Sequence, residues 1–251
     1  VFNNSLKKRI EKFRQGIDEK GLDGVLVCKR ENYMYLSGFT GTFAFLLVTG
    51  KKAYLVTDFR YRDQAARQSP HFEIVQYQGE VLQYISDIVK SNSILTLGFE
   101  DKYVTYDFYT RLKSELKGCR MEPLKGLLEK MRSTKDESEL LMIKKDVEIA
   151  DSAFSHILGF LRPGLKEKEV AAELEYSMRK LGARGPSFDT IVASGKRSSL
   201  PHGVASDKEI EHGDTVTLDY GAVYEGYCSD MTRTVFIGKP EAETEKIYNT
   251  V

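Results

Sequence analysis

The sequence predicts an α/β domain with a mixed sheet, followed by an α+β domain built around a β-hairpin. In the first half, short runs of apolar and β-branched residues alternate with helical patterns. Two long amphipathic helices then follow one another with no strand between them. Finally, residues 215–236 form two runs of alternating apolar and polar residues separated by Gly221 and Gly226, which is typical of an antiparallel hairpin.

The first domain is expected to span residues 1–131. A helix begins it at Asn3 or Ser5 and ends near Gly21, and its apolar face is Leu6, Ile10, Phe13 and Ile17. Strand-like runs follow, and helices near 81–90 and 106–116 alternate with the later ones. The predicted strands cover residues 24–28, 43–49, 53–57, 72–77 and 94–99.

The second domain is expected to span residues 132–251, because Ser133 and Thr134 carry overlapping helix-capping signals. A long helix ends at Pro163–Gly164, and a second helix ends at Gly182. A strand over 188–193 then leads towards the hairpin. The predicted apolar faces are Leu140, Ile143, Val147, Ala150, Phe154, Ile157 and Leu161 in the first helix, and Val170, Leu174, Met178 and Leu181 in the second.

The composition of the chain limits which partners and which cellular compartment we expect. Lys and Arg number 37 and Asp and Glu number 37, so no net charge favours nucleic acid or an anionic membrane. No apolar run approaches the roughly 20 residues that span a bilayer, and the first residues lack a signal-peptide pattern. Cys28, Cys119 and Cys228 are too scattered for a disulfide framework or a cysteine zinc site. We therefore expect a cytoplasmic protein.

Two aspartates in the hairpin suggest a metal site. Asp219 and Asp230 lie eleven residues apart, and alternation places Asp219 on the strand face opposite Val216, Leu218 and Tyr220. Asp is depleted from strands, and two facing carboxylates repel each other unless a positive charge lies between them. A hard divalent cation supplies that charge, since it prefers oxygen ligands. On spacing alone, a pair of solvated acids remains the alternative.

His202 is the second candidate for chemistry, because it lies between Pro201 and Gly203 in a loop that must be rigid and exposed. By itself, the Pro-His-Gly sequence is equally consistent with a histidine in a turn that has no special role. A near-neutral pKa would suit it to proton transfer.

Four motifs together resemble the proline-specific metallopeptidases of the pita-bread fold, which include Xaa-Pro dipeptidases (prolidases) and aminopeptidase P. They are N-Y-M-Y-L-S-G-F, S-G-K-R-S-S-L-P-H-G, G-D-T-V-T-L-D-Y-G-A and G-Y-C-S-D-M-T-R-T. The likeness to bacterial Xaa-Pro dipeptidases is strongest. The resemblance implies that 1–131 is a creatinase/prolidase-type N-terminal domain and that 132–251 is the first half of an α+β pita-bread catalytic domain.

The resemblance also implies the chemistry. Two divalent ions, manganese or cobalt, would be held by Asp219 and by a bridging Asp230, with His202 as the catalytic histidine beside the substrate. Thr232 and Arg233 would orient the carboxylates and balance their charge. The substrates would be proline-containing dipeptides or short peptides, cleaved at Xaa-Pro bonds, and the enzyme would be a homodimer.

The family's site has five ligands, and the remaining three, one histidine and two glutamates, come later in its sequences than these aspartates. Residues 240–248 begin a helix shortly before the chain ends at Val251. We therefore expect the chain to be part of a longer enzyme and to be inactive by itself. Two alternatives stay open: a metal-free, creatinase-like hydrolase, and a non-catalytic pseudoenzyme that binds peptides or proteins.

Overall fold

The structure is a computed structural model that describes residues 2–251. It divides into two compact units, one ending at Ser138 and one beginning at Glu139. Each unit has its own hydrophobic core and is described by itself.

The first unit contains a mixed six-stranded sheet in the order β4-β3-β2-β1-β5-β6. Pairing is antiparallel between β1 and β2 and between β2 and β3, and it is parallel elsewhere. This confirms the predicted α/β class. The strands are β1 Gly24–Val27, β2 Phe45–Thr49, β3 Ala53–Thr57, β4 Glu73–Gln76, β5 Thr96–Phe99 and β6 Arg120–Pro123. The short edge strand β6 was not among the predicted runs.

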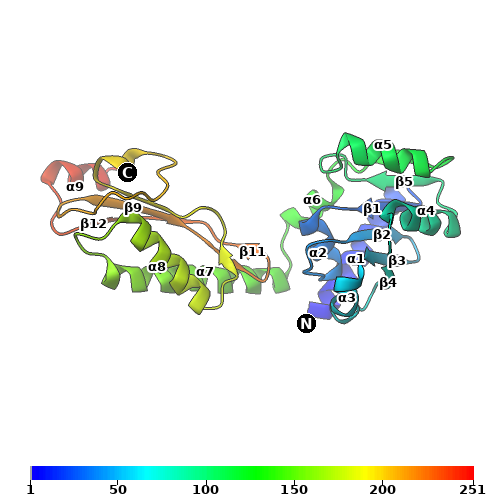
Figure 1. Cartoon of the computed structure of the whole chain (residues 1–251), viewed down its shortest axis with the longest axis horizontal. Helices are drawn as coiled ribbons and strands as arrows, with labels where there is room; N and C mark the ends of the chain where they lie inside the picture. Colours follow the sequence, from blue (N-terminus) through cyan, green and yellow to red (C-terminus); the bar gives the residue numbers. More distant parts are fainter. Residues whose placement is uncertain (1) are drawn as a thin grey trace. The chain divides into compact units, whose positions relative to one another are not determined.

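Helices cover both faces of this sheet (Figure 1). One face packs against α1 (Phe2–Glu19), α2 (Arg30–Ser37) and α6 (Leu127–Ser133), and the other against α4 (Val81–Ser91) and α5 (Tyr106–Glu115). The predicted face of α1 is confirmed, since Leu6, Ile10, Phe13 and Ile17 are all buried. A 3-10 turn, η1 (Phe59–Tyr61), and helix α3 (Arg62–Gln68) connect β3 to β4.

The second unit packs two long helices on one face of a three-stranded antiparallel sheet (Figure 1). The sheet order is β12-β9-β8, and a smaller sheet has the order β11-β10-β7. Over residues 2–251, the structure contains no helix both long and apolar enough to cross a membrane. The elements are α7 Glu137–Phe160, α8 Glu167–Lys180, β7 Gly185–Pro186, β8 Ile191–Ser194, η2 Gly195–Ser199, β9 Thr215–Tyr220, β10 Ala222–Tyr224, β11 Tyr227–Cys228, β12 Met231–Phe236 and α9 Ala242–Tyr248.

Alternation along β9 decides which of its faces is covered. Val216, Leu218 and Tyr220 are buried in the core with α7 and α8, whereas Thr215, Thr217 and Asp219 are partly exposed. The face of β9 that carries Asp219 is therefore the one turned away from the helices.

The predicted apolar face of α7 is partly wrong. Leu140 is 56% exposed, while Glu139 and Asp146 are buried with Ala150 and Ile157. The reason is a polar contact surface at the start of the helix, where the Tyr227 hydroxyl donates to Glu139 Oε1 at 3.1 Å. In α8, burial of Val170, Leu174 and Met178 is confirmed, but Leu181 lies past the end of the helix and is 43% exposed.

Candidate metal site

Asp219 lies one residue before the end of β9, in the middle strand of its sheet. Its cross-strand partner on β12 is Thr232, and its partner on β8 is Ile191. Directly opposed residues in antiparallel strands project their side chains to the same face. The Thr232 hydroxyl donates to Asp219 Oδ1 at 3.0 Å. Thr232 therefore fixes the orientation of the Asp219 carboxylate.

Asp230 immediately precedes β12, at the point where the hairpin passes from one sheet to the other. Pairing keeps one register on both sides of this point, because Tyr220 pairs with Met231 and Val223 pairs with Cys228, with two residues between them on each strand. By count, Asp230 comes opposite Gly221, two residues before Thr232, the cross-strand partner of Asp219. Diagonal neighbours in an antiparallel pair are about 7–8 Å apart at Cα, a span across which two aspartate side chains can converge on a cation.

We call residues 221, 229 and 230 the hairpin corner, and two serines close it. Ser187 Oγ donates to the Ser229 carbonyl at 2.8 Å, and the Ala222 N–H donates to Ser229 Oγ at 2.9 Å. A Cβ on Gly221 would lie 1.9 Å from the Ser229 carbonyl oxygen, so no side chain fits there. The corner is therefore close-packed, and this packing fixes the position of the Asp230 backbone.

The predicted hairpin is present, but it is divided at this corner into β9–β12 and β10–β11. Its tip is the two-residue turn Glu225–Gly226, in which φ is +48° and +84°. Positive φ at both positions is the geometry of a type I′ turn, whose twist matches that of the flanking strands.

Arg233 lies on the other face of the sheet from Asp219, because its partner on β9 is Leu218. Its guanidinium donates to Asp151 Oδ1 of α7 at 3.4 Å and to the Thr232 carbonyl at 3.0 Å, and it lies over the Phe154 ring. The structure thus brings Thr232, but not the Arg233 guanidinium, to the Asp219 carboxylate.

His202 lies exposed in residues 195–206, which we call the His202 loop. Val204 forms an isolated antiparallel bridge with Ile191, and Ile191 also pairs with Asp219 across β8 and β9. Strands are spaced about 4.7–4.9 Å apart, so Val204 lies two strand spacings, roughly 10 Å, from Asp219. Gly203 permits this approach, since a Cβ there would lie 2.9 Å from the Ala193 Cβ. The loop therefore runs along the sheet edge in the same row as Asp219.

Asp146 is a buried acid behind the hairpin corner that the sequence did not suggest. It is 0% exposed, and neither of its carboxylate oxygens has a hydrogen bond of ordinary geometry. Burial raises the pKa of the Asp146 carboxyl to about 6, while its interaction with Ser229 limits the rise. An acid in a helix is usually exposed, so periodicity carries no signal for it.

The donor set fits part of a divalent-metal site. Carboxylate oxygens are suitable ligands for hard divalent ions, and Asp219 and Asp230 supply them near the same end of the β9–β12 pair. Within residues 2–251, however, no group of three or more His, Cys, Asp or Glu side chains is arranged to hold a metal ion. By the chemistry of their side chains, the two aspartates could supply at most part of a ligand set.

Comparison with known proteins identifies both parts of the chain. Residues 9–134 match the creatinase/prolidase N-terminal domain, and residues 142–251 match metallopeptidase family M24. The chain is 37% identical to a Xaa-Pro dipeptidase of Pyrococcus horikoshii, over 100% of this chain and 69% of the relative. It is 46% identical to an uncharacterized peptidase of Bacillus subtilis, over 97% of this chain and 69% of the relative.

Solved structures give the same result. A Xaa-Pro dipeptidase from Bacillus anthracis superposes with a TM-score of 0.93 at 48% identity, covering 98% of this chain and 69% of that one. An X-Pro aminopeptidase from Thermotoga maritima superposes with a TM-score of 0.89 at 39% identity, covering 94% and 69%. These matches confirm the resemblance drawn from the motifs. The chain belongs to metallopeptidase family M24 and carries a creatinase/prolidase N-terminal domain.

Proposed function

We propose that the protein belongs to an enzyme that hydrolyses Xaa-Pro bonds in dipeptides or short peptides with the help of two divalent cations. One observation supports the proposal: Asp219 lies on the face of β9 opposite α7 and α8, and Asp230 precedes β12 two residues from Thr232, the cross-strand partner of Asp219. Relatives named Xaa-Pro dipeptidase and X-Pro aminopeptidase support the substrate class.

Each residue has a proposed role. Asp219 and Asp230 bind the cations, and Thr232 orients Asp219 through its 3.0 Å hydrogen bond. His202 contacts the substrate and holds or moves a proton near the scissile carbonyl. Arg233 supports the site indirectly, through the Thr232 carbonyl that it binds.

Divalent ions, when bound, lower the pKa of a coordinated water so that hydroxide is available at neutral pH. Manganese or cobalt is the proposed metal. Since the described residues hold no third ligand grouped with the aspartates, we propose that residues 1–251 alone bind two cations weakly and are inactive. The family's later ligands, one histidine and two glutamates, would complete the site.

We also propose that the enzyme is a cytoplasmic homodimer that does not use nucleic acid or membranes as partners. Three cysteines, Cys28, Cys119 and Cys228, are too scattered along the sequence for a disulfide framework, which suits a reducing compartment. Gel filtration with light scattering would test the dimer.

The decisive assay compares Ala-Pro with Ala-Ala hydrolysis in the presence of Mn²⁺, for residues 1–251 and for the gene's full-length product. We expect hydrolysis of Ala-Pro by the full-length product only, abolished by a chelator and reduced at least about a thousandfold by Asp219→Asn or Asp230→Asn. Asp207→Asn, at an exposed acid directly after the His202 loop, is the matched control. Hydrolysis that is unaffected by chelation would instead indicate a metal-free, creatinase-like enzyme.

A peptide-binding pseudoenzyme is the second candidate, and it would be favoured if the full-length product lacked the remaining ligands. It predicts that the full-length product binds Ala-Pro in calorimetry without turning it over. Full-length turnover would exclude it.

A further inference from the structure

The His202 loop has few regular backbone hydrogen bonds of its own. Inside it, η2 makes a single turn, and Gly203 and Val204 donate to the Leu200 and His202 carbonyls. Such a loop is fixed only if something outside it binds both of its ends. That group is Glu167, the first residue of α8, which is 0% exposed.

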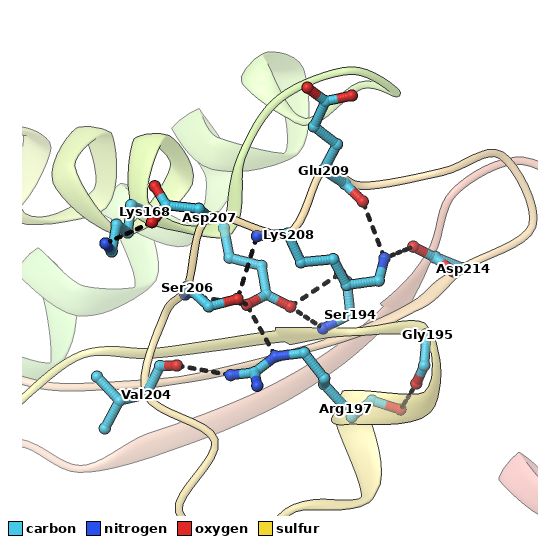
Figure 2. Close-up of polar contacts among 12 residues, drawn as sticks. Lys168, Ser194, Gly195, Arg197, Val204, Ser206, Asp207, Lys208, Glu209 and Asp214 are labelled. Carbon is cyan, nitrogen blue, oxygen red and sulfur yellow. Dashed lines mark hydrogen bonds and ion pairs between the residues drawn. The ribbon is translucent and has the colours of Figure 1, made fainter.

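The Glu167 carboxylate accepts hydrogen bonds from both ends of the loop. Oε1 accepts from the Ser194 N–H at 2.7 Å and from Ser194 Oγ at 2.9 Å, at the end of β8. Oε2 accepts from the Ser206 N–H at 3.0 Å and from Ser206 Oγ at 2.6 Å. Figure 2 shows Ser194 and Ser206 meeting at this point from opposite sides of the loop. One buried carboxylate thus closes the loop at its base.

Arg197 extends the contact to the part of the loop next to His202. Its Nε donates to Glu167 Oε2 at 3.1 Å, and its Nη2 donates to the Val204 carbonyl at 2.8 Å (Figure 2). Val204 is the residue that bridges to Ile191, beside Asp219. A continuous path of hydrogen bonds therefore leads from α8 through Arg197 to the strand row that contains Asp219.

The charge state of Glu167 agrees with this geometry. Burial by itself raises the pKa of the Glu167 carboxyl, but hydrogen bonds from Ser206 and Ser194 outweigh burial and leave that pKa below its usual range. A buried carboxylate without such donors would cost several kcal/mol. The loop ends therefore supply the donors that keep the carboxylate ionised, and the carboxylate in turn holds the loop ends.

We propose that Glu167 is a positioning residue that fixes the His202 loop, and with it His202, against the strand row that contains Ile191 and Asp219. This inference rests on the proposed role of His202. The alternative is that Glu167 only stabilises the start of α8. In that case the fold would be the same, but the order of the His202 loop would not depend on Glu167.

The test uses Glu167→Gln, which keeps the side-chain volume but turns an NH₂ group towards donors on Ser194, Ser206 or Arg197. In hydrogen exchange on residues 1–251, we expect the amides of 194–206 to exchange at least about tenfold faster, with the β9–β12 ladder unchanged. Asp207→Asn is the matched control, because Asp207 directly follows the loop and pairs with Lys168 at an exposed site. Loop exchange that matches wild type in Glu167→Gln overturns the inference.

A second variant covers the case in which Glu167→Gln does not fold. Arg197→Gln removes the path to Val204 and leaves all four serine contacts to Glu167 in place. We expect faster exchange confined to 200–204 with an unchanged melting temperature, and unchanged exchange there would count against the path.

The catalytic readout uses the full-length, metal-loaded protein. Glu167→Gln should lower kcat for Ala-Pro by about tenfold to a hundredfold while Mn²⁺ affinity stays within about twofold, because a misplaced His202 does not touch the ligands. Equal losses of kcat and metal affinity would show a structural role and contradict the inference. A wild-type protein without peptidase activity would defeat the proposed function alone, since the exchange result stands independently.

Discussion

At the scale of one residue, the buried carboxyl group of Asp146, near the proposed site, destabilises the folded state. Its carboxyl group is fully buried and lacks well-formed hydrogen bonds, while most buried polar groups have partners. The interaction with Ser229 links it to the hairpin corner next to Asp230. A side chain kept in so unfavourable a position suggests that the corner needs a polar group behind it.

Replacing Asp146 by Asn should stabilise the protein at high pH. The folded-state pKa of about 6 lies above the unfolded value, so deprotonation opposes folding, and stability is lost as pH rises through 6. Urea unfolding at pH 8 should show Asp146→Asn more stable than wild type by up to about 3 kcal/mol, and the gap should shrink towards pH 4.5. Asp151→Asn, an exposed change on the same helix, is the control. A less stable Asp146→Asn at pH 8 would contradict the burial argument.

Some site residues could be predicted from the sequence and others could not. Alternation was enough to place Asp219 on the face away from Leu218 and Tyr220, because period 2 is a local property. Glu167 could not be found, since an acid at the start of a helix is already explained by the helix dipole. The burial of Glu167 depends on hydrogen bonds from Ser194 and Ser206. These two residues are distant from Glu167 in the sequence and reach it only in the folded chain.

At the scale of the element, the β9–β12 ribbon owes its geometry to the hairpin corner. The register is continuous through the corner, yet the backbone there makes serine contacts in place of regular ladder bonds. Gly221 is the residue that permits this, because the Ser229 carbonyl occupies the place of a Cβ.

Gly221→Ala should therefore disturb both stability and the metal site. The added methyl group would lie 1.9 Å from the Ser229 carbonyl oxygen, so the corner must open, at a cost of about 1–3 kcal/mol or more. Gly159→Ala, within α7 and with no atom within 4 Å of the new Cβ, is the control and should be neutral or stabilising. Thermal unfolding checks both, and equal melting temperatures for Gly221→Ala and wild type would show that the corner is not close-packed.

Element prediction succeeded where a pattern was long and one-sided. The face of α1 was predicted correctly because Ile10, Phe13 and Ile17 pack in the core against one face of the sheet. The face of α7 was predicted wrongly, because its first turns pack against the polar tip region of the hairpin through Glu139 and Tyr227. Hydrophobic periodicity does not detect polar contacts of this kind. The short helices α3 and α6 were missed because seven residues carry too little periodicity.

At the scale of the whole molecule, the two units have different relations to the proposed chemistry. The first has helices on both faces of its sheet. In the second, α7 and α8 cover one face of β9 and β12, and Asp219 lies on the opposite face, which α9 meets at Phe236 through Tyr248. All proposed site residues belong to the second unit, and the family match to 142–251 covers each of them. The proposed metal site therefore belongs to the second unit.

The most direct test is a crystal of residues 1–251 soaked in excess Mn²⁺ and measured for anomalous scattering. We predict an anomalous peak bound by both aspartates, with Mn–O distances of roughly 2.0–2.6 Å to Asp219 and Asp230, and no peak in Asp230→Asn. A fully soaked crystal with no peak between these two carboxylates, or with manganese bound only elsewhere, would contradict the account.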